Sequence, residues 1–431
     1  MDRIKQLPYD ETIQCVQCGY CLPACPTYLT MKRETHSPRG RINLVKMAAE
    51  GHLSLDELEE PLDLCLGCRA CETACPSGVP YGKILEGARE VLAENKAKNV
   101  SRPIAWVQDT LIQKVFPDSK RLQTAADMIW MYQSSGLQKL AHKSKLTRVL
   151  PENLRVFEEV LPKVTSPMER RQRPRLFKPK LPGTSPKWKI AFFTGCVMDA
   201  IFERINRLSM ELLGLAGCEV HVIAEQTCCG ALHAHTGRMD DSIELAKRNI
   251  EAFERLDVDF IVNNAGGCGA MLVEYDQLFH GDPEWEARAK AFVAKTRDIS
   301  QILAQCELPF MQPINEVVTY QRSCHMTNVQ KVVKEPLDLI KKIPGVTFKE
   351  MANPNMCCGS AGIYNVVNYG ESMEILDVKM DAVKATGGTT IVTTNPGCLL
   401  QMKLGVQREG LTGQVRAVHL VELLAESAGL L

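Results

Sequence analysis

Short apolar runs and amphipathic segments alternate through the second half of the 431-residue chain. The apolar runs KIAFF, EVHVI and DFIVNN lie within residues 188–312, and EVVTY, VTFKEM and TTIVTT lie within residues 313–431. Runs of this length between turn residues indicate strands, whereas segments such as RINRLSMELLGLA carry apolar residues at helical spacing. Alternating strands and helices predict parallel sheets covered by helices, so we expect two tandem α/β domains in these ranges.

The first 187 residues follow a different pattern. Apolar positions across residues 42–62 recur at helical rather than alternating spacing, which predicts a helical domain over residues 1–98. Residues 99–187 contain amphipathic helical stretches and then the proline-studded segment SPMERRQRPRLFKPKLPGTSPKW, so we interpret them as a helical segment and linker. Together these patterns predict an α+β multidomain protein.

Two features of the linker range have a specific interpretation. An apolar stripe at helical spacing is interpreted as a core face, with docking to a partner as the alternative; it comprises Ile104, Val107, Leu111 and Val115. A basic run is interpreted as solvent-exposed linker, because no aromatic residues are interleaved with it as nucleic-acid binding would favour; it comprises Arg170, Arg171, Arg173 and Arg175.

The two α/β domains repeat one another. Cys196 and Cys324 each end a predicted strand and are 128 positions apart, the two CCG motifs are 129 apart, and Cys268 and Cys398 are 130 apart. This near-constant offset indicates a tandem duplication. Ligands collect beyond the carboxyl ends of parallel strands, so four thiols per half are predicted to converge there, with each CCG forming a loop. The candidate metal ligands are Cys196, Cys228, Cys229, Cys268, and Cys324, Cys357, Cys358, Cys398.

The composition and charge of the chain bear on its ligands and on its place in the cell. Lys plus Arg and Asp plus Glu both number 51, so the chain as a whole has no charge excess for nucleic acid. The N-terminus lacks a secretory apolar core and no apolar run is long enough to span a membrane, so a soluble, cytoplasmic protein is expected, with any membrane contact peripheral or through partners. Eighteen cysteines in such a protein favour metal binding over disulfides.

Two short motifs have the spacing C-x2-C-x2-C-x3-C-P, namely CVQCGYCLPACP at residues 15–26 and CLGCRACETACP at residues 65–76. In two-cluster ferredoxins with this spacing, three thiolates hold one [4Fe-4S] cluster and the fourth binds the other cluster. The predicted ligands are therefore Cys15, Cys18, Cys21 and Cys75 for one cluster, and Cys65, Cys68, Cys71 and Cys25 for the other. Two zinc sites are the alternative, but zinc does not explain the third cysteine, the proline or the duplication.

Several other residues near these motifs have two interpretations. Arg39 and Arg41 flank Gly40. In one interpretation they belong to a loop before a helix whose N-cap is Ser37. In the other, their positive charges raise the reduction potential of a cluster. Three histidines near the long motifs are interpreted as ordinary loop residues, with a proton or redox-tuning role as the alternative for the last; they are His233, His235 and His325. Cys218 and Cys306, outside both patterns, are predicted core thiols.

The chain resembles the glycolate oxidase iron-sulfur subunit family, and more broadly the iron-sulfur subunits related to heterodisulfide reductase. The resemblance is carried by motifs in the same order, namely CVQCGYCLPACPTY, SPRGR, CLGCRACETACPSGVPYG and two CCG motifs. The resemblance covers nearly the whole chain. It implies two [4Fe-4S] clusters that carry electrons from FAD-containing dehydrogenase subunits in a hetero-oligomer, which oxidise glycolate to glyoxylate, towards an acceptor such as quinone. No dinucleotide-binding or Walker motif stands out, so substrate oxidation is expected on the partner.

The chain departs from some of these relatives at the end of each CCG half. Those relatives have a CxxC motif at this place. In this sequence the first cysteine of the motif is replaced in each half, by Ala265 before Cys268 and by Asn395 before Cys398. Each half could hold a further iron-sulfur cluster, hold zinc, or serve as scaffold. Two alternative functions stay open: the iron-sulfur subunit of a D-lactate or glycerol-3-phosphate dehydrogenase, and a disulfide reductase that uses the CCG domains.

Overall fold

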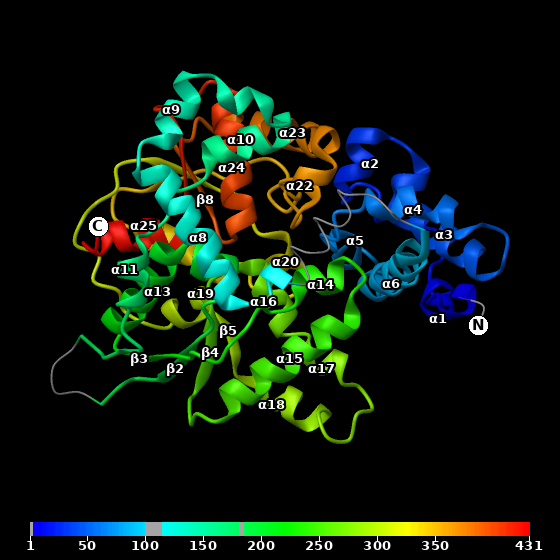
Figure 1. Cartoon of the computed structure of the whole chain (residues 1–431), viewed down its shortest axis with the longest axis horizontal. Helices are drawn as coiled ribbons and strands as arrows, with labels where there is room; N and C mark the ends of the chain where they lie inside the picture. The colour runs from blue at the N-terminus through cyan, green and yellow to red at the C-terminus, as the bar shows by residue number, and fades with distance from the viewer. Residues whose placement is uncertain (1–2, 100–113, 181–184) are drawn as a thin grey trace.

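The computed structural model describes residues 3–99, 114–180 and 185–431. The N-terminal helices form one end of the molecule, and two sheets with their covering helices form the other end (Figure 1). No helix in the described ranges is both long enough and apolar enough to cross a membrane. The predicted apolar stripe falls largely outside these ranges; of its four residues only Val115 is described, and it packs against a small core with Leu122 and Ala126.

The N-terminal domain is helical, as predicted. Its elements are η1 (Arg3–Gln6), α1 (Tyr9–Thr12), α2 (Pro26–Met31), η2 (Glu34–His36), α3 (Pro38–Ala49), α4 (Leu55–Asp63), α5 (Ala70–Thr73) and α6 (Tyr81–Asn99). Ser37 caps α3 by accepting a hydrogen bond from the Gly40 amide, which confirms the predicted N-cap. Arg39, Gly40 and Arg41 lie in the first turns of α3, so the alternative of a loop at these residues is wrong.

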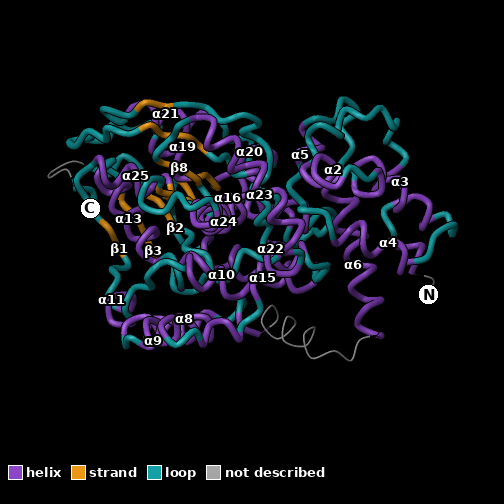
Figure 2. Tube along the Cα trace, turned by 90° about the horizontal axis from the view of Figure 1, so that it is seen from above, coloured by secondary structure: helices purple, strands orange, loops and turns teal. Residues whose placement is uncertain are grey.

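The middle segment packs against both α/β domains: Leu122 packs with Ala200 of the first, and Asn153 donates to the Val366 carbonyl oxygen of the second. It contains α8 (Ser119–Ser134), α9 (Leu137–Lys143), η4 (Leu146–Val149), α10 (Glu152–Val160) and α11 (Pro167–Arg171), and α8 and α9 lie together along one edge of the molecule (Figure 2). The prediction of a solvent-exposed basic run is wrong for Arg170, which is 8% exposed and forms an ion pair with Asp127. Arg173 likewise pairs with Asp199. Carboxylates far away in the sequence neutralise these arginines, which the local pattern does not reveal.

The first α/β domain contains a five-stranded sheet in the order β1-β3-β2-β4-β5. Its strands are β1 (Leu176–Phe177), β2 (Lys189–Phe192), β3 (Glu219–Val222), β4 (Phe260–Asn263) and β5 (Thr296–Asp298). All neighbours are parallel except β1, which pairs antiparallel with β3 and comes from the predicted linker range. The helices are α12 (Val197–Ala200), α13 (Glu203–Leu215), α14 (Ala231–His235), α15 (Met239–Glu254), α16 (Gly266–Leu272), α17 (Tyr275–Leu278), α18 (Glu286–Lys295) and α19 (Ile299–Leu303).

The second α/β domain contains a fully parallel sheet in the order β7-β6-β8-β9. Its strands are β6 (Val317–Tyr320), β7 (Thr347–Phe348), β8 (Thr390–Thr393) and β9 (Arg416–His419). Its helices are α20 (Cys324–Asn328), α21 (Lys334–Lys342), α22 (Tyr364–Val367), α23 (Tyr369–Thr386), α24 (Pro396–Arg408) and α25 (Leu420–Ser427). The central strands β2 and β8 are buried on both faces, as in parallel sheets covered by helices on both sides.

The two halves share one large hydrophobic core, and the first half has a second buried cluster of its own, which includes Phe193 and Phe253. Residues of the first half such as Leu212 and Val262 belong to the same buried cluster as Ile391 and Leu424 of the second half. The buried His419 ring joins the halves as well, since its Nε2 lies 3.0 Å from the Asn264 carbonyl oxygen. A shared core fixes the cysteine-bearing edges of the two sheets relative to each other.

Candidate iron-sulfur sites

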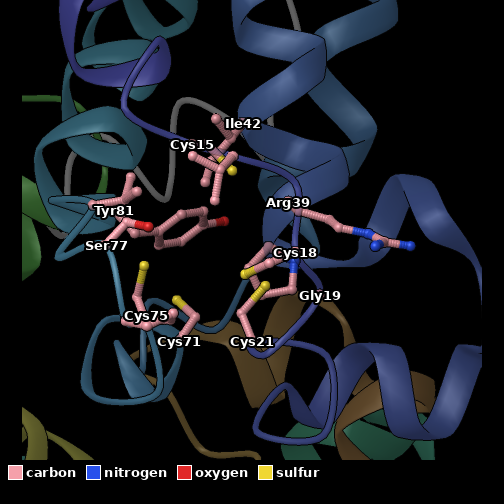
Figure 3. Close-up of a pocket in the computed structure, with 14 residues that line it drawn as sticks. Cys15, Cys18, Gly19, Cys21, Arg39, Ile42, Cys71, Cys75, Ser77 and Tyr81 are labelled. Carbon is pink, nitrogen blue, oxygen red and sulfur yellow. The ribbon is translucent and has the colours of Figure 1, made fainter.

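Cysteines from both short motifs line one pocket in the N-terminal domain. The first motif contributes Cys15, Cys18 and Cys21, and the second contributes Cys71 and Cys75. Figure 3 shows the sulfur atoms of Cys18, Cys21, Cys71 and Cys75 directed into the same space, next to the Tyr81 ring. We call Cys15, Cys18, Cys21 and Cys75 the outer thiol set; Cys18 is exposed at the surface.

A second pocket in the same domain is lined by Cys25 together with Cys65, Cys68 and Cys71. We call Cys65, Cys68, Cys71 and Cys25 the inner thiol set, and all four side chains are buried. The fourth cysteine of each motif therefore lies beside the first three of the other motif. This is the exchange that the spacing predicts, although the assignment of each thiol as a ligand remains a prediction.

The local sequence explains these loops. Gly19 and Gly67 adopt positive φ angles of 85° and 60°, a region that side chains other than glycine rarely occupy. The Gly67 amide donates to Cys65 Sγ at 3.4 Å, so the turn places a backbone donor on a candidate ligand. Pro26 is the first residue of α2 and Cys25 is its N-cap, because proline fits the first helical turn, where its missing N–H is not needed.

The CCG halves bring their cysteines together at the predicted edges. Cys196 and Cys324 begin short helices four residues after β2 and β6 end, rather than ending the strands themselves. Each CCG is a loop, and Gly230 and Gly359 have φ angles of 88° and 90°. We call Cys196, Cys228, Cys229 and Cys268 the first cysteine set, and Cys324, Cys357, Cys358 and Cys398 the second cysteine set.

Within each set the thiols are neighbours. Cys324 Sγ and Cys357 Sγ are 3.9 Å apart. In the first set, a hydrogen bond with Cys228 and then burial raise the pKa of Cys196. For Cys228 and Cys229, a hydrogen bond with one neighbouring thiol lowers the pKa, but a hydrogen bond with another thiol and burial raise it above the ordinary value. Both sets line one cavity of about 990 Å³ between the two halves and the N-terminal domain, which also contributes Cys65 and Leu66.

The inner thiol set lies against the second half. His325 Nε2 is 2.9 Å from the Gly67 carbonyl oxygen, and Asn328 Nδ2 donates to the Cys68 carbonyl oxygen at 2.9 Å. Arg69 Nη1 contacts both carboxylate oxygens of Glu274, at 2.6 and 2.7 Å, which ties the same loop to the first half. The N-terminal domain is therefore docked on both halves through the loop that carries its second motif.

Comparison with known proteins agrees with this arrangement. The family model described as "4Fe-4S dicluster domain" matches residues 11–79, and the "Cysteine-rich domain" CCG model matches residues 190–273 and 318–403. The model "Glycolate oxidase iron-sulfur subunit, linker region" matches residues 103–161. A probable glycolate oxidase iron-sulfur subunit from Bacillus subtilis (strain 168) is 52% identical, over 97% of this chain and 94% of that protein.

The chain belongs to the glycolate oxidase iron-sulfur subunit family. The corresponding subunit of Escherichia coli (strain K12) is 27% identical over 89% of this chain and 88% of its own length. Lactate utilization protein A of Halalkalibacterium halodurans is 33% identical, but over only 55% of this chain and 96% of that protein. The predicted order of dicluster domain, linker and two CCG domains is confirmed, as are iron-sulfur cofactors and a role as an iron-sulfur electron-transfer subunit.

The residues of this family member fit such clusters. Burial, followed by the charges of neighbouring cysteines, raises the pKa values of Cys68 and Cys71 well above the ordinary value. Gathering several thiolates in one buried place is therefore unfavourable without a cation, which bound iron supplies. No group of three or more His, Cys, Asp or Glu side chains in the described ranges is arranged to hold a single metal ion. That finding concerns one ion, whereas a four-iron cluster binds one cysteine on each iron.

Positive charge is concentrated on the inner thiol set. Arg41 is 1% exposed and donates to the Pro61 carbonyl oxygen and to Thr27, with Nη1 4.0 Å from Cys25 Sγ. Burial raises the pKa of Cys65, but the Arg41 and Arg89 charges bring it below the ordinary value. The Arg39 guanidinium instead points away from the outer pocket and pairs with Glu34 (Figure 3). The proposed electrostatic role therefore suits Arg41 and not Arg39.

All three histidines lie in helices rather than in ordinary loops, and two of them, His235 and His325, lie at the interface with the N-terminal domain. His233 and His235 belong to α14, and His325 belongs to α20. His235 pairs with Glu86 at 3.2 Å and its ring centroid is 5.2 Å from that of His325. Sequence reasoning missed Asn328 and the Arg69–Glu274 pair, for which no local pattern exists, although the position of His325 next to a candidate ligand pointed to this helix.

Cys218 and Cys306 are buried, as predicted for core thiols. A hydrogen bond from Cys218 lowers the pKa of Cys306 to about 7, and Lys187 Nζ lies 3.8 Å from Cys306 Sγ. Neither thiol lines the cavity that the two cysteine sets share. They are therefore separate from the candidate metal sites.

Proposed function

We propose that this chain transfers electrons within a glycolate oxidase complex, accepting them from an FAD-containing subunit that oxidises glycolate to glyoxylate. The observation that supports this most directly is the pair of thiol sets in the dicluster domain, built by exchange of Cys25 and Cys75 between the two motifs. Family membership supports the complex, because full-length relatives carry the name of the glycolate oxidase iron-sulfur subunit.

The outer and inner thiol sets would each hold one [4Fe-4S] cluster. When bound, such clusters accept and release electrons one at a time. The protein's own contribution is to hold the thiols in two adjoining pockets and to set the charge around them. Cys71 lines both pockets, so the two sites adjoin, which suits direct transfer between them.

The outer thiol set would be the side at which electrons enter. Cys18 is exposed, whereas every thiol of the inner set is buried, and Cys65 lines the cavity that the CCG halves share. Electron transfer from another subunit requires close approach, and only the outer set offers a ligand at the surface. The inner set would then pass electrons on towards the CCG halves.

The matching variants Cys75→Ser and Cys25→Ser test the ligand assignment. Full-length protein purified without oxygen should contain about eight irons for the dicluster pair alone, and more if the CCG halves are loaded. Cys75→Ser should alter only the low-temperature EPR signal that Cys15→Ser also alters, whereas Cys25→Ser should alter the other signal. If Cys75→Ser and Cys65→Ser altered the same signal, the proposed exchange would be wrong.

Glycolate itself is tested with the partner. Adding glycolate to the chain together with its flavoprotein should reduce both dicluster signals, and D-lactate should do so more slowly. The linker match favours glycolate, because it lies at residues 103–161, whereas the lactate utilization relatives cover only about half of the chain. Faster reduction by D-lactate would favour the lactate alternative.

We infer that the terminal acceptor is a quinone and that the protein is cytoplasmic, reaching the inner face of the membrane only peripherally or through partners. The absence of a spanning helix in the described ranges is compatible with that location. Reduction of a soluble quinone analogue by the glycolate-reduced complex, and its loss when this chain is omitted, would support the acceptor. Reduction at an unchanged rate without the chain would contradict it.

A further inference from the structure

The duplication lets the two CCG halves be compared residue by residue. Helices α15 and α23 begin 130 positions apart, at Met239 and Tyr369. In both halves the CCG glycine packs on a serine of this helix: a Cβ on Gly230 would lie 2.6 Å from Ser242 Oγ, and one on Gly359 would lie 2.9 Å from the carbonyl oxygen of Ser372. The two serines are also 130 positions apart. The helices therefore correspond position by position.

At one buried position behind the CCG loop, the two halves differ in charge. The first half has Asn249, and the position 130 residues later is Lys379. Asn249 is fully buried and neutral, and its side chain accepts from the Thr227 amide at 2.8 Å and donates to the Cys228 carbonyl oxygen at 2.9 Å. The first half thus uses this position to hold the backbone of its CCG loop.

Lys379 is 1% exposed, although lysine is almost never fully buried without a partner. Its Nζ donates to the Asn353 carbonyl oxygen at 2.8 Å and lies 3.7 Å from Met351 Sδ. None of the carboxylates in the described ranges forms an ion pair with it. Burial lowers the pKa of Lys379 to about 8, and the groups whose negative charge would raise it again are Cys358, Cys357 and Cys398, three members of the second cysteine set. An anionic centre on the second cysteine set would stabilise the charged form of this buried lysine, which burial otherwise disfavours.

The second half is also the half whose cysteines meet the dicluster domain. Cys68 and Cys357 belong to one small buried cluster, with Cys324 packed against it, and the Cys324 charge contributes to the raised pKa of Cys68. His325 and Asn328 of α20 hold the backbone of the inner set. Their counterparts 128 positions earlier are Val197 and Ala200, which cannot form those side-chain hydrogen bonds.

We propose that Lys379 is the counter-charge of an iron-sulfur centre on the second cysteine set, and that it makes this half, not the first, the electron acceptor of the dicluster domain. The proposal rests on the proposed function. One electron passes from the centre on the inner thiol set, which is oxidised, to the centre on the second cysteine set, which is reduced; no bond changes and no proton moves. A buried positive charge favours the reduced, more negative centre, so the second half has a higher potential than the first.

The test is a potentiometric titration of full-length protein, purified without oxygen and followed by low-temperature EPR. The signal of the second half is identified as the one lost in Cys324→Ser. The key variant is Lys379→Asn, which copies the first half; Lys379→Arg keeps the charge, and Lys384→Met removes an exposed charge from the same helix. We expect Lys379→Asn to lower the reduction equilibrium constant of this signal at least tenfold, or about 59 mV for one electron. The other two variants should leave it nearly unchanged.

Iron content decides the remaining outcomes. If Lys379→Asn loses about four irons and Lys379→Arg keeps them, the charge is needed to hold the centre, which supports the proposal. An unchanged potential in Lys379→Asn overturns it, as does loss of iron in both Lys379 variants, which would show a packing role. If the unmodified protein holds only about eight irons, the proposal fails while the dicluster function stands. Failure of glycolate and its flavoprotein to reduce the dicluster signals would instead refute the proposed function.

Discussion

Replacement of Arg41 by Gln should lower the reduction potential of the cluster on the inner thiol set. Arg41 is a buried positive charge beside this set: its Nη1 is 4.0 Å from Cys25 Sγ, and its charge lowers the pKa of Cys65. Gln keeps a polar side chain that can donate to the Pro61 carbonyl oxygen, which Arg41 Nε contacts at 2.6 Å. The substitution therefore removes the charge with limited change of the hydrogen bonding.

The magnitude follows from Coulomb's law. A unit charge at the 4.0 Å separation seen between Arg41 and Cys25 is worth about 1 kcal/mol in water and about 4 kcal/mol at an effective dielectric constant near 20. Since a tenfold change is about 1.4 kcal/mol and about 59 mV for one electron, these limits correspond to about 40 and about 170 mV. The added electron is shared over the whole cluster and not held on one sulfur, so the shift should lie in the lower half of this range.

The assay is an EPR-monitored titration of four proteins: the unmodified chain, Arg41→Gln, Arg39→Gln and Arg41→Lys. Arg39 lies two residues away on the same helix but points outwards and pairs with Glu34, so its removal should shift neither cluster by more than about 20 mV, as expected for an exposed and screened charge. Arg41→Lys keeps the charge and should restore most of the potential. Equal shifts in Arg39→Gln and Arg41→Gln, or none in either, would refute the electrostatic argument.

Three further predictions concern stability. Burial lowers the pKa of His419 to about 4 in the folded protein, from about 6.5 in the unfolded chain. Between these pH values the unfolded chain therefore binds the proton more readily than the folded protein does. The neutral ring contributes its full stabilisation above about pH 6.5, and the free energy of unfolding falls by about 3 kcal/mol as the pH drops towards 4. Thermal unfolding of His419→Gln should therefore depend less steeply on pH over this range than that of the unmodified protein, and equal slopes would contradict the assignment. Arg69→Met and Glu274→Met should show a coupling of about 1–3 kcal/mol in a double-mutant cycle of denaturant unfolding, because the pair is largely buried and joins two domains; additive effects would mean that the contact does not hold the domains together. Gly230→Ala should lower the unfolding midpoint by the equivalent of at least about 1–2 kcal/mol, since φ is 88° and a Cβ would lie 2.6 Å from a serine oxygen; a midpoint equal to that of the unmodified protein would show that the loop adjusts at no cost.

The features that could be predicted from sequence are those that depend on the spacing of residues within a motif or between repeats. The two C-x2-C-x2-C-x3-C-P motifs fix which thiols approach each other, because ligands two or three residues apart must share one turn. The duplication was equally visible, since three landmarks recur at nearly one offset. The short strands β5 and β9 were not predicted: Thr296–Asp298 has two charged residues of three and no apolar run, and it is a strand only because it pairs with β4.

Contacts between distant segments could not be predicted. Arg170 belongs to a basic run that resembles an exposed linker, but Asp127 lies against it in the fold and the side chain is buried. Asn328 and His325 bind backbone oxygens of Cys68 and Gly67, more than 250 positions away. Every residue has a backbone carbonyl, so the sequence does not show which of them accepts a hydrogen bond. Neither charge pairing nor motif spacing therefore indicates this interface. Likewise, Lys379 becomes notable only once its burial is known.

The duplicated halves illustrate how a shared fold comes to hold two different environments. Helices α12 and α20 occupy equivalent places after the first strand of each half, but α12 is covered by the middle segment, where Ala200 packs with Leu122 and Ala126, whereas α20 is covered by the dicluster domain. Apolar side chains suit the first surface and hydrogen-bonding side chains suit the second. The same division continues inwards, from Ala200 in the first half and Asn328 in the second, which contact the covering segments, to Asn249 and Lys379 behind the CCG loops. Docking of one cluster-bearing domain on a two-fold repeat necessarily makes the two halves inequivalent. Through the charge at position 379, this difference should set the reduction potential of the centre on the second cysteine set.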